Sequence, residues 1–525
     1  MKVALIQCPA WNTDSPPHGL SLLSADLKNH GHSVMCYDLN MAIFRCALSQ
    51  SGLPEQKEWD FTRIDDNWTD LNVVQQVFEK SLPCLSPYID KIREYNPEII
   101  GFSVFSTTAY FSYFLTRHFR IEFPDAKIIW GGPECYENFG RVEYIAKHIP
   151  EIDVIFTGYS CGIAPAVVDF FEKYSVFPAS APGYLNTNVN SNTSFISADT
   201  DFNQTPVADF RAFNVADYAM QYFPVWVNKG CVNRCAFCQE CRANTTYEWR
   251  DPGIIAKEIA HYKTELPQIQ HFWLTSSNIG GNLNKLIELS ELLMNAAPGI
   301  SWVSQISVHM QLTLPVLELM KDSGCNCLYF GIESGSNKVL RLMNKPITRK
   351  LIKQVVRNTV KVGISFNFNL IVGFPGETIS DFIKTLFLIH HFRRYGISPS
   401  VATCKIIPNS TLFMQPEKYG IINHTQDNWL TEDRKNTLQT RNKRKQIAER
   451  AFSGSLINMF QIPYRLFLFA QYYGNNKASG VKYSLVIPAN ILSKLLFMIS
   501  FIPFVIWISV ISIRLKYNEL RLINT

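Results

Sequence analysis

Apolar runs of strand length alternate with longer helical stretches through the first 175 residues. KVALIQC is the first such run, and SVMCYDLN, PEIIGFSV, AKIIWGGPE and IDVIFTG follow it along the chain. Helical stretches separate these runs; one is PPHGLSLLSADLKNHGH, which stops at Gly31. Strands separated by helices predict a parallel sheet with right-handed crossovers. We therefore expect an α/β fold that opens with a doubly wound, Rossmann-like sheet.

A second series of strands and helices begins near residue 221. Its apolar runs are QYFPVWVNKG, HFWLTSS, SWVSQISV, CLYFGIES, FNFNLIVGF and VATCKIIP. Helical stretches such as NKLIELSELLMNA lie between them. Strand–helix units repeated at roughly regular spacing predict a partial (β/α)6 barrel of the TIM type, with active-site residues at the carboxyl ends of its strands.

These patterns divide the chain into four expected regions. Residues 1–175 form the sheet domain, and residues 176–220, rich in Ser, Asn, Thr, Pro and Ala, suit a linker. Residues 221–415 form the barrel, and residues 416–525 form a helical C-terminal region.

The C-terminal region leaves two interpretations open. The basic run RNKRKQIAER (441–450) is typical of a solvated helix face or of a patch for a membrane surface or an acidic partner. The uncharged run LLFMISFIPFVIWISVISI (495–513) is long enough to span a bilayer, but a helix docked on the barrel has the same composition. Membrane association through this region stays a hypothesis.

Composition limits the class of protein. A chain of 525 residues with 47% apolar and 18% charged residues suits two or three domains with large cores. A net charge of +6 does not indicate a nucleic-acid binder. Thirteen cysteines in so long a chain do not form a disulfide scaffold, and they fit a reducing compartment with free thiols. The first apolar run is too short for a signal peptide, so we expect a cytoplasmic location.

Three cysteines share one short loop. Cys231, Cys235 and Cys238 lie in NKGCVNRCAFCQEC with the spacing C-x3-C-x2-C. Thiolates this close together are expected to bind one soft metal centre, and cysteine holds iron–sulfur clusters. A cubane of four irons with three protein ligands keeps one iron open for chemistry, as catalytic metal sites do. Cys241 offers an alternative, because a fourth thiolate would close a zinc or electron-transfer site.

This spacing resembles the signature of the radical S-adenosylmethionine (SAM) enzymes. The resemblance implies a [4Fe–4S] cluster whose open iron chelates SAM, and cleavage of SAM to a 5′-deoxyadenosyl radical. It also implies an electron donor such as flavodoxin or ferredoxin. FGIESGS (330–336) and GFPGET (373–378) extend the resemblance over roughly residues 220–410.

The same resemblance implies where SAM binds. The residues concerned are Phe237, Glu333, Ser334, Gly373, Pro375 and Gly376. A carboxylate such as Glu333 can accept from ribose hydroxyls or pair with an ammonium group. Acidic residues also favour helix N-termini, so Glu333 could instead cap a helix that begins near Ser336.

The strand ends of the first sheet suggest a second ligand. Ligands of open parallel sheets bind at the carboxyl ends of the strands, and glycine lets them approach the backbone. The residues at those ends are Ser103, Ser106, Gly131, Gly132 and Gly158. A sheet domain of this pattern before a radical SAM core resembles the cobalamin-binding radical SAM enzymes, which implies that methylcobalamin stacks on this edge.

Histidine at the cobalt is not expected. The motif D-x-H-x-x-G is absent, because Asp14 and His18 are too far apart to form it. His30 and His32 are expected at the surface near a helix end.

The sequence thus predicts a radical SAM enzyme, specifically a cobalamin-dependent methyltransferase acting on an unactivated centre. Two alternatives remain open: a radical SAM enzyme without cobalamin, and a non-catalytic iron–sulfur or zinc module tethered to a membrane. A peptide, a lipid or a small metabolite would all fit as substrate, and no nucleic acid is expected.

Overall fold

The computed structural model describes nine segments of the chain and three single residues. They are residues 1–49, 68–136, 141–179, 183–187, 201–219, 222–240, 246–397, 399–425 and 427–453, with Leu53, Glu55 and Trp59. The chain forms two compact units. The first comprises the described residues within 1–232, 240–304 and 318–326, and the second comprises those within 233–239, 305–317 and 327–525.

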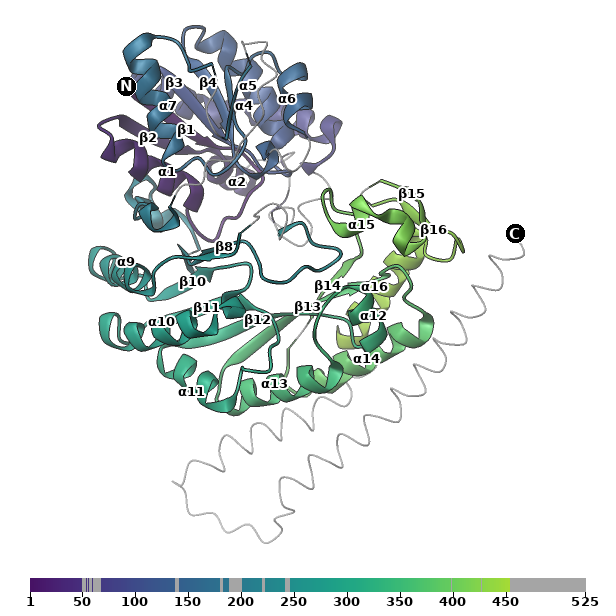
Figure 1. Cartoon of the computed structure of the whole chain (residues 1–525). Coiled ribbons are helices and arrows are strands. Elements are labelled where there is room, and N and C mark those ends of the chain that lie inside the picture. Colours follow the sequence, from purple (N-terminus) through teal and green to yellow (C-terminus); the bar gives the residue numbers. More distant parts are fainter. Residues whose placement is uncertain are drawn as a thin grey trace. The chain divides into compact units, whose positions relative to one another are not determined.

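The first unit contains the predicted N-terminal sheet (Figure 1). Its strands are β1 (Lys2–Gln7), β2 (Ser33–Asp38), β3 (Ile99–Ser103), β4 (Lys127–Gly131), β5 (Val154–Phe156) and β6 (Tyr184–Asn186), in the order β2-β1-β3-β4-β5-β6. The first five pair in parallel, and β6 pairs antiparallel with β5. All five predicted strands are present, and the region expected as a linker supplies the sixth.

Helices cover both faces of this sheet (Figure 1). They are α1 (His18–Asn29), α2 (Leu39–Ser49), α4 (Leu71–Tyr95), α5 (Ala109–Glu122), α6 (Val142–His148) and α7 (Ile163–Tyr174). Alternate residues of a strand point to opposite faces. Val3 and Leu5 accordingly pack with α1 and α7, while Ala4 and Ile6 pack with α2, α4, α5 and α6. The sheet is therefore doubly wound, as predicted.

One pair of cysteines differs from the expectation of free thiols. Cys46 of α2 and Cys84 of α4 form a disulfide. The sequence did not predict this pairing, because nothing in the composition distinguishes two of thirteen cysteines.

The six strands predicted for the barrel also form one sheet. They are β7 (Phe223–Trp226), β10 (His271–Thr275), β11 (Ser301–Ile306), β12 (Cys325–Glu333), β13 (Ser365–Val372) and β14 (Ser400–Thr403), in the order β14-β13-β12-β11-β10-β7. This sequential order is that of a partial barrel. Two short hairpins complete the strands: β8 (Asn228–Lys229) with β9 (Glu248–Trp249), and β15 (Ile421–His424) with β16 (Trp429–Thr431).

Helices follow the strands of this second sheet. They are α9 (Pro252–Glu265), α10 (Leu283–Ala296), α11 (Leu314–Asp322), α12 (Asn337–Leu342), α13 (Arg349–Lys361), α14 (Ile379–Arg393), α15 (Thr411–Met414) and α16 (Leu438–Ser453). Polar caps fix several of their starts. Asp251 accepts from the first amides of α9, and Thr378 and Asp381 form a capping box on α14.

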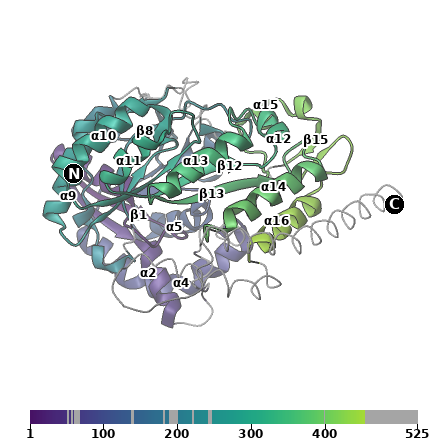
Figure 2. The ribbon, with the colours of Figure 1, turned by 90° about the horizontal axis from the view of Figure 1, so that it is seen from below.

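The basic run 441–450 lies within α16, which packs against α14 and β14 (Figure 2). Arg441 is fully buried over the Trp429 ring, 3.9 Å from its centroid. Arg444 is also buried, and its Nη1 lies 2.9 Å from Oε2 of Glu377. Both interpretations of this run were wrong for these two arginines, which attach α16 to the rest of the second unit.

Within the part of the chain that the structure describes, no helix has the length and apolarity needed to cross a bilayer. The candidate segment 495–513 lies outside the described residues.

Buried histidine makes the fold sensitive to acid. His390 of α14 is 5% exposed, and burial, helped by the nearby charge of Arg393, lowers the pKa of His390 to about 4. The unfolded chain binds this proton near pH 6.5, so stability is complete above that pH and falls as the pH drops from about 6.5 to about 4. We expect a loss of up to about 3 kcal/mol from this residue. Urea unfolding of wild type and His390→Phe across this range should show a flatter pH profile for the variant; equal slopes would contradict the assignment.

Candidate functional site

A pocket of about 250 Å³ opens in the first unit at the carboxyl edge of the N-terminal sheet. It runs between one face of the sheet and the helices α1 and α7, and most of its wall is apolar. Four residues predicted from the sequence line it: Ser103, Gly131, Gly132 and Gly158. Ser106, the fifth, is exposed and is not among the lining residues. The structure thus brings most of the predicted strand-end residues together.

Glycine keeps this pocket hollow. Gly132 has φ +103°, and a Cβ there would lie 2.7 Å from the carbonyl oxygen of Val104. Only glycine is accommodated at such a position. At Gly131 a Cβ would lie 3.5 Å from Cβ of Phe156, an ordinary contact, so a side chain at Gly131 would enter the pocket without displacing the backbone.

Aromatic rings surround the same pocket. The ring centroids of Tyr136 and Tyr159 are 5.7 Å apart, and those of Tyr159 and Trp226 are 5.2 Å apart. Burial raises the pKa of Tyr136, and burial raises the pKa of the Cys161 thiol to about 12. Both groups are therefore uncharged near pH 7, and this part of the pocket wall is aromatic rather than ionic.

Histidines near this sheet have distinct environments. His18 lines the pocket, and burial together with the charge of Arg250 lowers its pKa to about 3, but its Nε2 is inaccessible. The prediction that His30 and His32 lie at the surface was wrong for His32. That residue is 5% exposed, with Nε2 3.0 Å from Oδ1 of Asp169.

The cysteine loop spans the boundary of the two units in sequence. Cys231 belongs to the first unit, whereas Cys235 and Cys238 belong to the second. All three are free of disulfide bonds. In the second unit, the Cys238 amide donates to the Cys235 carbonyl at 3.1 Å, which forms a turn between these two ligand candidates. Cys241, the alternative fourth ligand, lies outside the described residues.

The second unit holds this loop by its backbone. The Ala236 amide donates to the Met343 carbonyl at 2.9 Å, and the Leu412 amide donates to the Ala236 carbonyl at 2.9 Å. Phe237 packs against an apolar cluster that includes Phe374 of the GFPGET turn. Two segments that the sequence assigned to SAM binding are therefore in one cluster.

Glu333 ends β12 in an unusual conformation. It has φ +64°, next to an irregularity in the pairing of β12 with β13. Its Oε1 accepts from Nζ of Lys345 at 2.8 Å, and both residues are buried. The alternative that Glu333 caps a helix was wrong, because α12 has Ser336 as its N-cap residue. A left-handed conformation at a non-glycine residue is strained, and such strain is concentrated at functional sites.

The GFPGET turn is fixed by a buried carboxylate. Gly373 and Gly376 have φ +74° and +81°, and the Gly373 amide donates to Oε2 of Glu377 at 2.7 Å. Pro375 between them is buried. Arg441 of α16 lies directly against Gly373, so a side chain at this glycine would collide with it.

Ser334 has a local structural role. It is fully buried, and its hydroxyl accepts from the Ser336 amide at 3.1 Å and lies 3.2 Å from Oγ1 of Thr385. These contacts join the end of β12 to α14.

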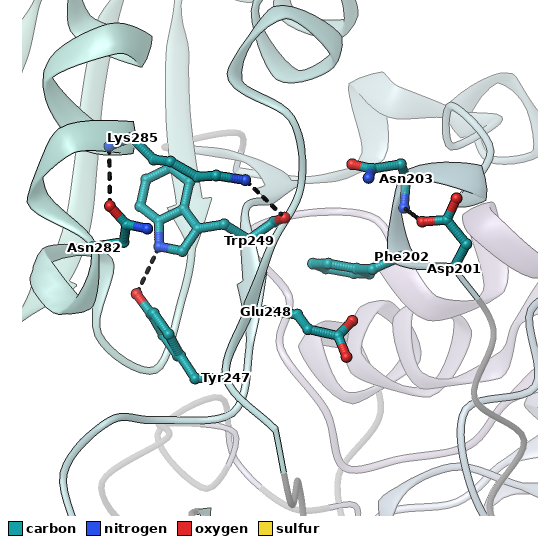
Figure 3. Close-up of a pocket in the computed structure, with 8 residues that line it drawn as sticks. All are labelled: Asp201, Phe202, Asn203, Tyr247, Glu248, Trp249, Asn282 and Lys285. Atoms are coloured by element: carbon teal, nitrogen blue, oxygen red, sulfur yellow. Dashed lines mark hydrogen bonds between the residues drawn. The ribbon is translucent and has the colours of Figure 1, made fainter.

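A second pocket, of about 510 Å³, lies in the first unit (Figure 3). It is lined by Asp201, Phe202, Asn203, Tyr247, Glu248, Trp249, Asn282 and Lys285. The Trp249 indole donates to the Tyr247 hydroxyl at 2.6 Å, and Lys285 Nζ lies 3.5 Å from the Trp249 carbonyl oxygen. Burial raises the pKa of Tyr247 to about 12, and the charge of Cys231 adds to this.

Comparison with known proteins identifies the second series of strands. Residues 227–389 match the radical SAM superfamily. The chain contains a radical SAM domain. An uncharacterized methyltransferase of Pyrococcus horikoshii is 22% identical over 307 residues, 56% of this chain and 64% of that protein. A tRNA-2-methylthio-N(6)-dimethylallyladenosine synthase of Thermoanaerobacter sp. is 30% identical over 183 residues, 32% of this chain and 38% of that protein. This chain covers less than two thirds of these relatives.

Solved structures extend the similarity beyond the radical SAM domain. The radical SAM methyltransferase TsrM from Kitasatospora setae, solved with cobalamin and a [4Fe–4S] cluster, has a TM-score of 0.59 and 17% identity over 86% of this chain and 85% of TsrM. The cobalamin-dependent radical SAM enzyme OxsB has a TM-score of 0.57 and 14% identity over 80% of this chain and 56% of OxsB. At these identities the likeness establishes the fold, a sheet domain followed by a radical SAM core.

Sequence reasoning missed several residues of these sites. Lys345 pairs with Glu333, Trp226 lines the sheet pocket and Tyr247 lines the second pocket, but none of the three belongs to a motif. The two aromatic residues of YEW (247–249) were a signal for the second pocket that the sequence analysis did not use.

Proposed function

We propose that this protein is a cobalamin-dependent radical SAM methyltransferase acting on an unactivated centre. When bound, the cluster supplies the electron that cleaves SAM to methionine and a 5′-deoxyadenosyl radical, and methylcobalamin supplies the methyl group. The observation that carries this proposal is the glycine-lined pocket at the carboxyl edge of a doubly wound sheet, in a chain that also has a radical SAM domain.

The pocket fits part of cobalamin. Its 250 Å³ is too small for a corrin ring, but its narrow apolar shape between the sheet, α1 and α7 suits a flat aromatic base such as the one that ends the nucleotide tail of cobalamin. The two related folds are those of cobalamin-binding proteins. Ser103, Gly131, Gly132 and Gly158 would hold this tail, and the corrin would rest on the strand ends.

The cysteine loop supplies suitable ligands for a [4Fe–4S] cluster. Cys231, Cys235 and Cys238 lie on one short loop and form no disulfide bond, and thiolates are the ligands of [4Fe–4S] clusters. Phe237, Glu333 and the Gly373–Gly376 turn would then hold SAM. The chain's own contribution is to position the cofactors and to exclude water.

Anaerobic reconstitution tests the proposal. The protein is loaded with iron, sulfide and hydroxocobalamin, desalted, and then reduced in the presence of SAM. We expect a retained cobalamin spectrum and release of 5′-deoxyadenosine. A colourless apoprotein after incubation with cobalamin alone would favour the cobalamin-independent alternative. A full cubane that never yields 5′-deoxyadenosine would contradict radical SAM chemistry.

Filling the sheet pocket should release cobalamin. Gly131→Val puts a branched side chain into the pocket without a backbone clash, so we expect cobalamin affinity to fall at least about tenfold, or about 1.4 kcal/mol. Ser106→Ala is the matched control, because Ser106 does not line the pocket. Equilibrium dialysis with hydroxocobalamin measures both. Unchanged affinity in Gly131→Val would place the cofactor elsewhere.

A further inference from the structure

Lys345 is held beside the cysteine loop by the two residues that precede it. The Met343 carbonyl accepts from the amide of Ala236, which follows Cys235 directly. The Asn344 side-chain amide donates to the Arg234 carbonyl at 2.7 Å. Two consecutive residues before Lys345 thus bind the residues on either side of Cys235.

The ammonium group of Lys345 is enclosed. Its side chain is 5% exposed, and its Nζ donates to Oε1 of Glu333 at 2.8 Å. Gly331 makes room for this pair: a Cβ at Gly331 would lie 2.6 Å from Glu333 Oε1 and 2.8 Å from Lys345 Nζ. The pair is therefore packed against the β12 backbone, with little freedom to move away from the loop.

Stability alone does not account for such a pair. Removing two charges from water costs several kcal/mol per ion, and apolar residues of similar volume are often as good or better. The contacts of Met343 and Asn344 with the cysteine loop thus keep the positive charge of Lys345 near the segment that carries Cys235.

We infer that Lys345 raises the reduction potential of the cluster held by Cys231, Cys235 and Cys238. The inference rests on the proposed function only in assuming that this cluster forms. Reduction adds one negative charge to a cluster, and its potential depends on nearby charge and solvent exposure. A fixed ammonium in a low-dielectric site stabilises the reduced form, and the carboxylate of Glu333 offsets part of this effect.

An anaerobic redox titration of the reconstituted cluster without SAM, followed by electron paramagnetic resonance, tests this. The variants are Lys345→Met, Lys345→Arg and Glu333→Gln, with Lys384→Met as control because Lys384 is half-exposed and pairs with Asp381 on α14. At a fixed potential, we expect the ratio of reduced to oxidised cluster to fall about tenfold in Lys345→Met, a shift of about 59 mV for one electron. Lys345→Arg and Lys384→Met should match wild type, and Glu333→Gln should shift the potential upward.

A lower reduction potential in Lys345→Met together with a higher one in Glu333→Gln would not result from a loss of structure, because breaking the ion pair is common to both variants. If Lys345→Met fails to hold the cluster, the Glu333→Gln variant tests the inference. A raised reduction potential in Glu333→Gln supports it, and an unchanged potential overturns it. Unchanged potentials in both variants, with full iron content, overturn the inference and leave the proposed function intact. A wild-type protein that takes up no cluster overturns the proposed function itself.

Discussion

Single replacement of Cys231, Cys235 or Cys238 by alanine should abolish formation of 5′-deoxyadenosine. Two thiolates cannot hold a cubane in place, and the chemistry needs an iron that is both anchored and open. We expect the rate to fall at least about a thousandfold, or about 4 kcal/mol in activation free energy. Chromatography of anaerobic assays gives this rate, and iron analysis with the visible spectrum reports cluster content.

Alanine variants of two other cysteines show whether the loss of activity is specific to the three proposed cluster ligands. Cys327→Ala is a suitable control, because Cys327 is a free, buried thiol of β12. Cys241→Ala separates the open cluster from a closed four-cysteine site. We expect both variants to keep the cluster and to cleave SAM. If Cys241→Ala instead loses as much iron as the alanine variants of Cys231, Cys235 and Cys238, the site is a closed four-cysteine site, which would indicate a non-catalytic module.

The sheets were predictable because buried parallel strands are read directly from apolar runs. KVALIQ contacts helices on both faces, so it needs apolar residues at consecutive positions, and the same holds for IIGFS of β3. Parallel pairing was expected once the helices between the strands were recognised, whereas the order of the strands was not predicted. The strand-end residues Gly131, Gly132 and Gly158 were then expected at one edge, and they line one pocket.

Side-chain partnerships were not predictable in the same way. The pairing of Glu333 with Lys345 depends on an irregularity in β12 and on φ +64° at Glu333, and neither leaves a pattern in the sequence. The basic run of α16 looked solvated because charge alone does not reveal a buried partner. Ser106 is three residues from Ser103 but follows the end of the strand, so a loop sets its direction.

Removing Arg444 is expected to destabilise the second unit strongly. Its Nη1 donates to Oε2 of Glu377 at 2.9 Å, and both side chains are almost completely buried. Arg444→Met would leave the Glu377 carboxylate without its charge partner, which costs about 3–5 kcal/mol for a buried pair. Because Glu377 also accepts from the Gly373 amide, the Gly373–Gly376 turn, which we propose to bind SAM, should loosen. Chemical denaturation measures the loss, and Lys445→Met, at a half-exposed position of α16, is the control.

The double variant Glu377→Gln, Arg444→Met distinguishes a lost attraction from an uncompensated charge. If the cost of Arg444→Met comes from a carboxylate left in an apolar site, neutralising that carboxylate should recover much of the stability. Glutamine can still accept from the Gly373 amide, so the turn should also regain its shape and any SAM affinity that it lost. If the double variant is instead as unstable as the sum of the two single variants, the two residues act independently, and α16 would be held to the turn by Arg441 and its contacts with Trp429.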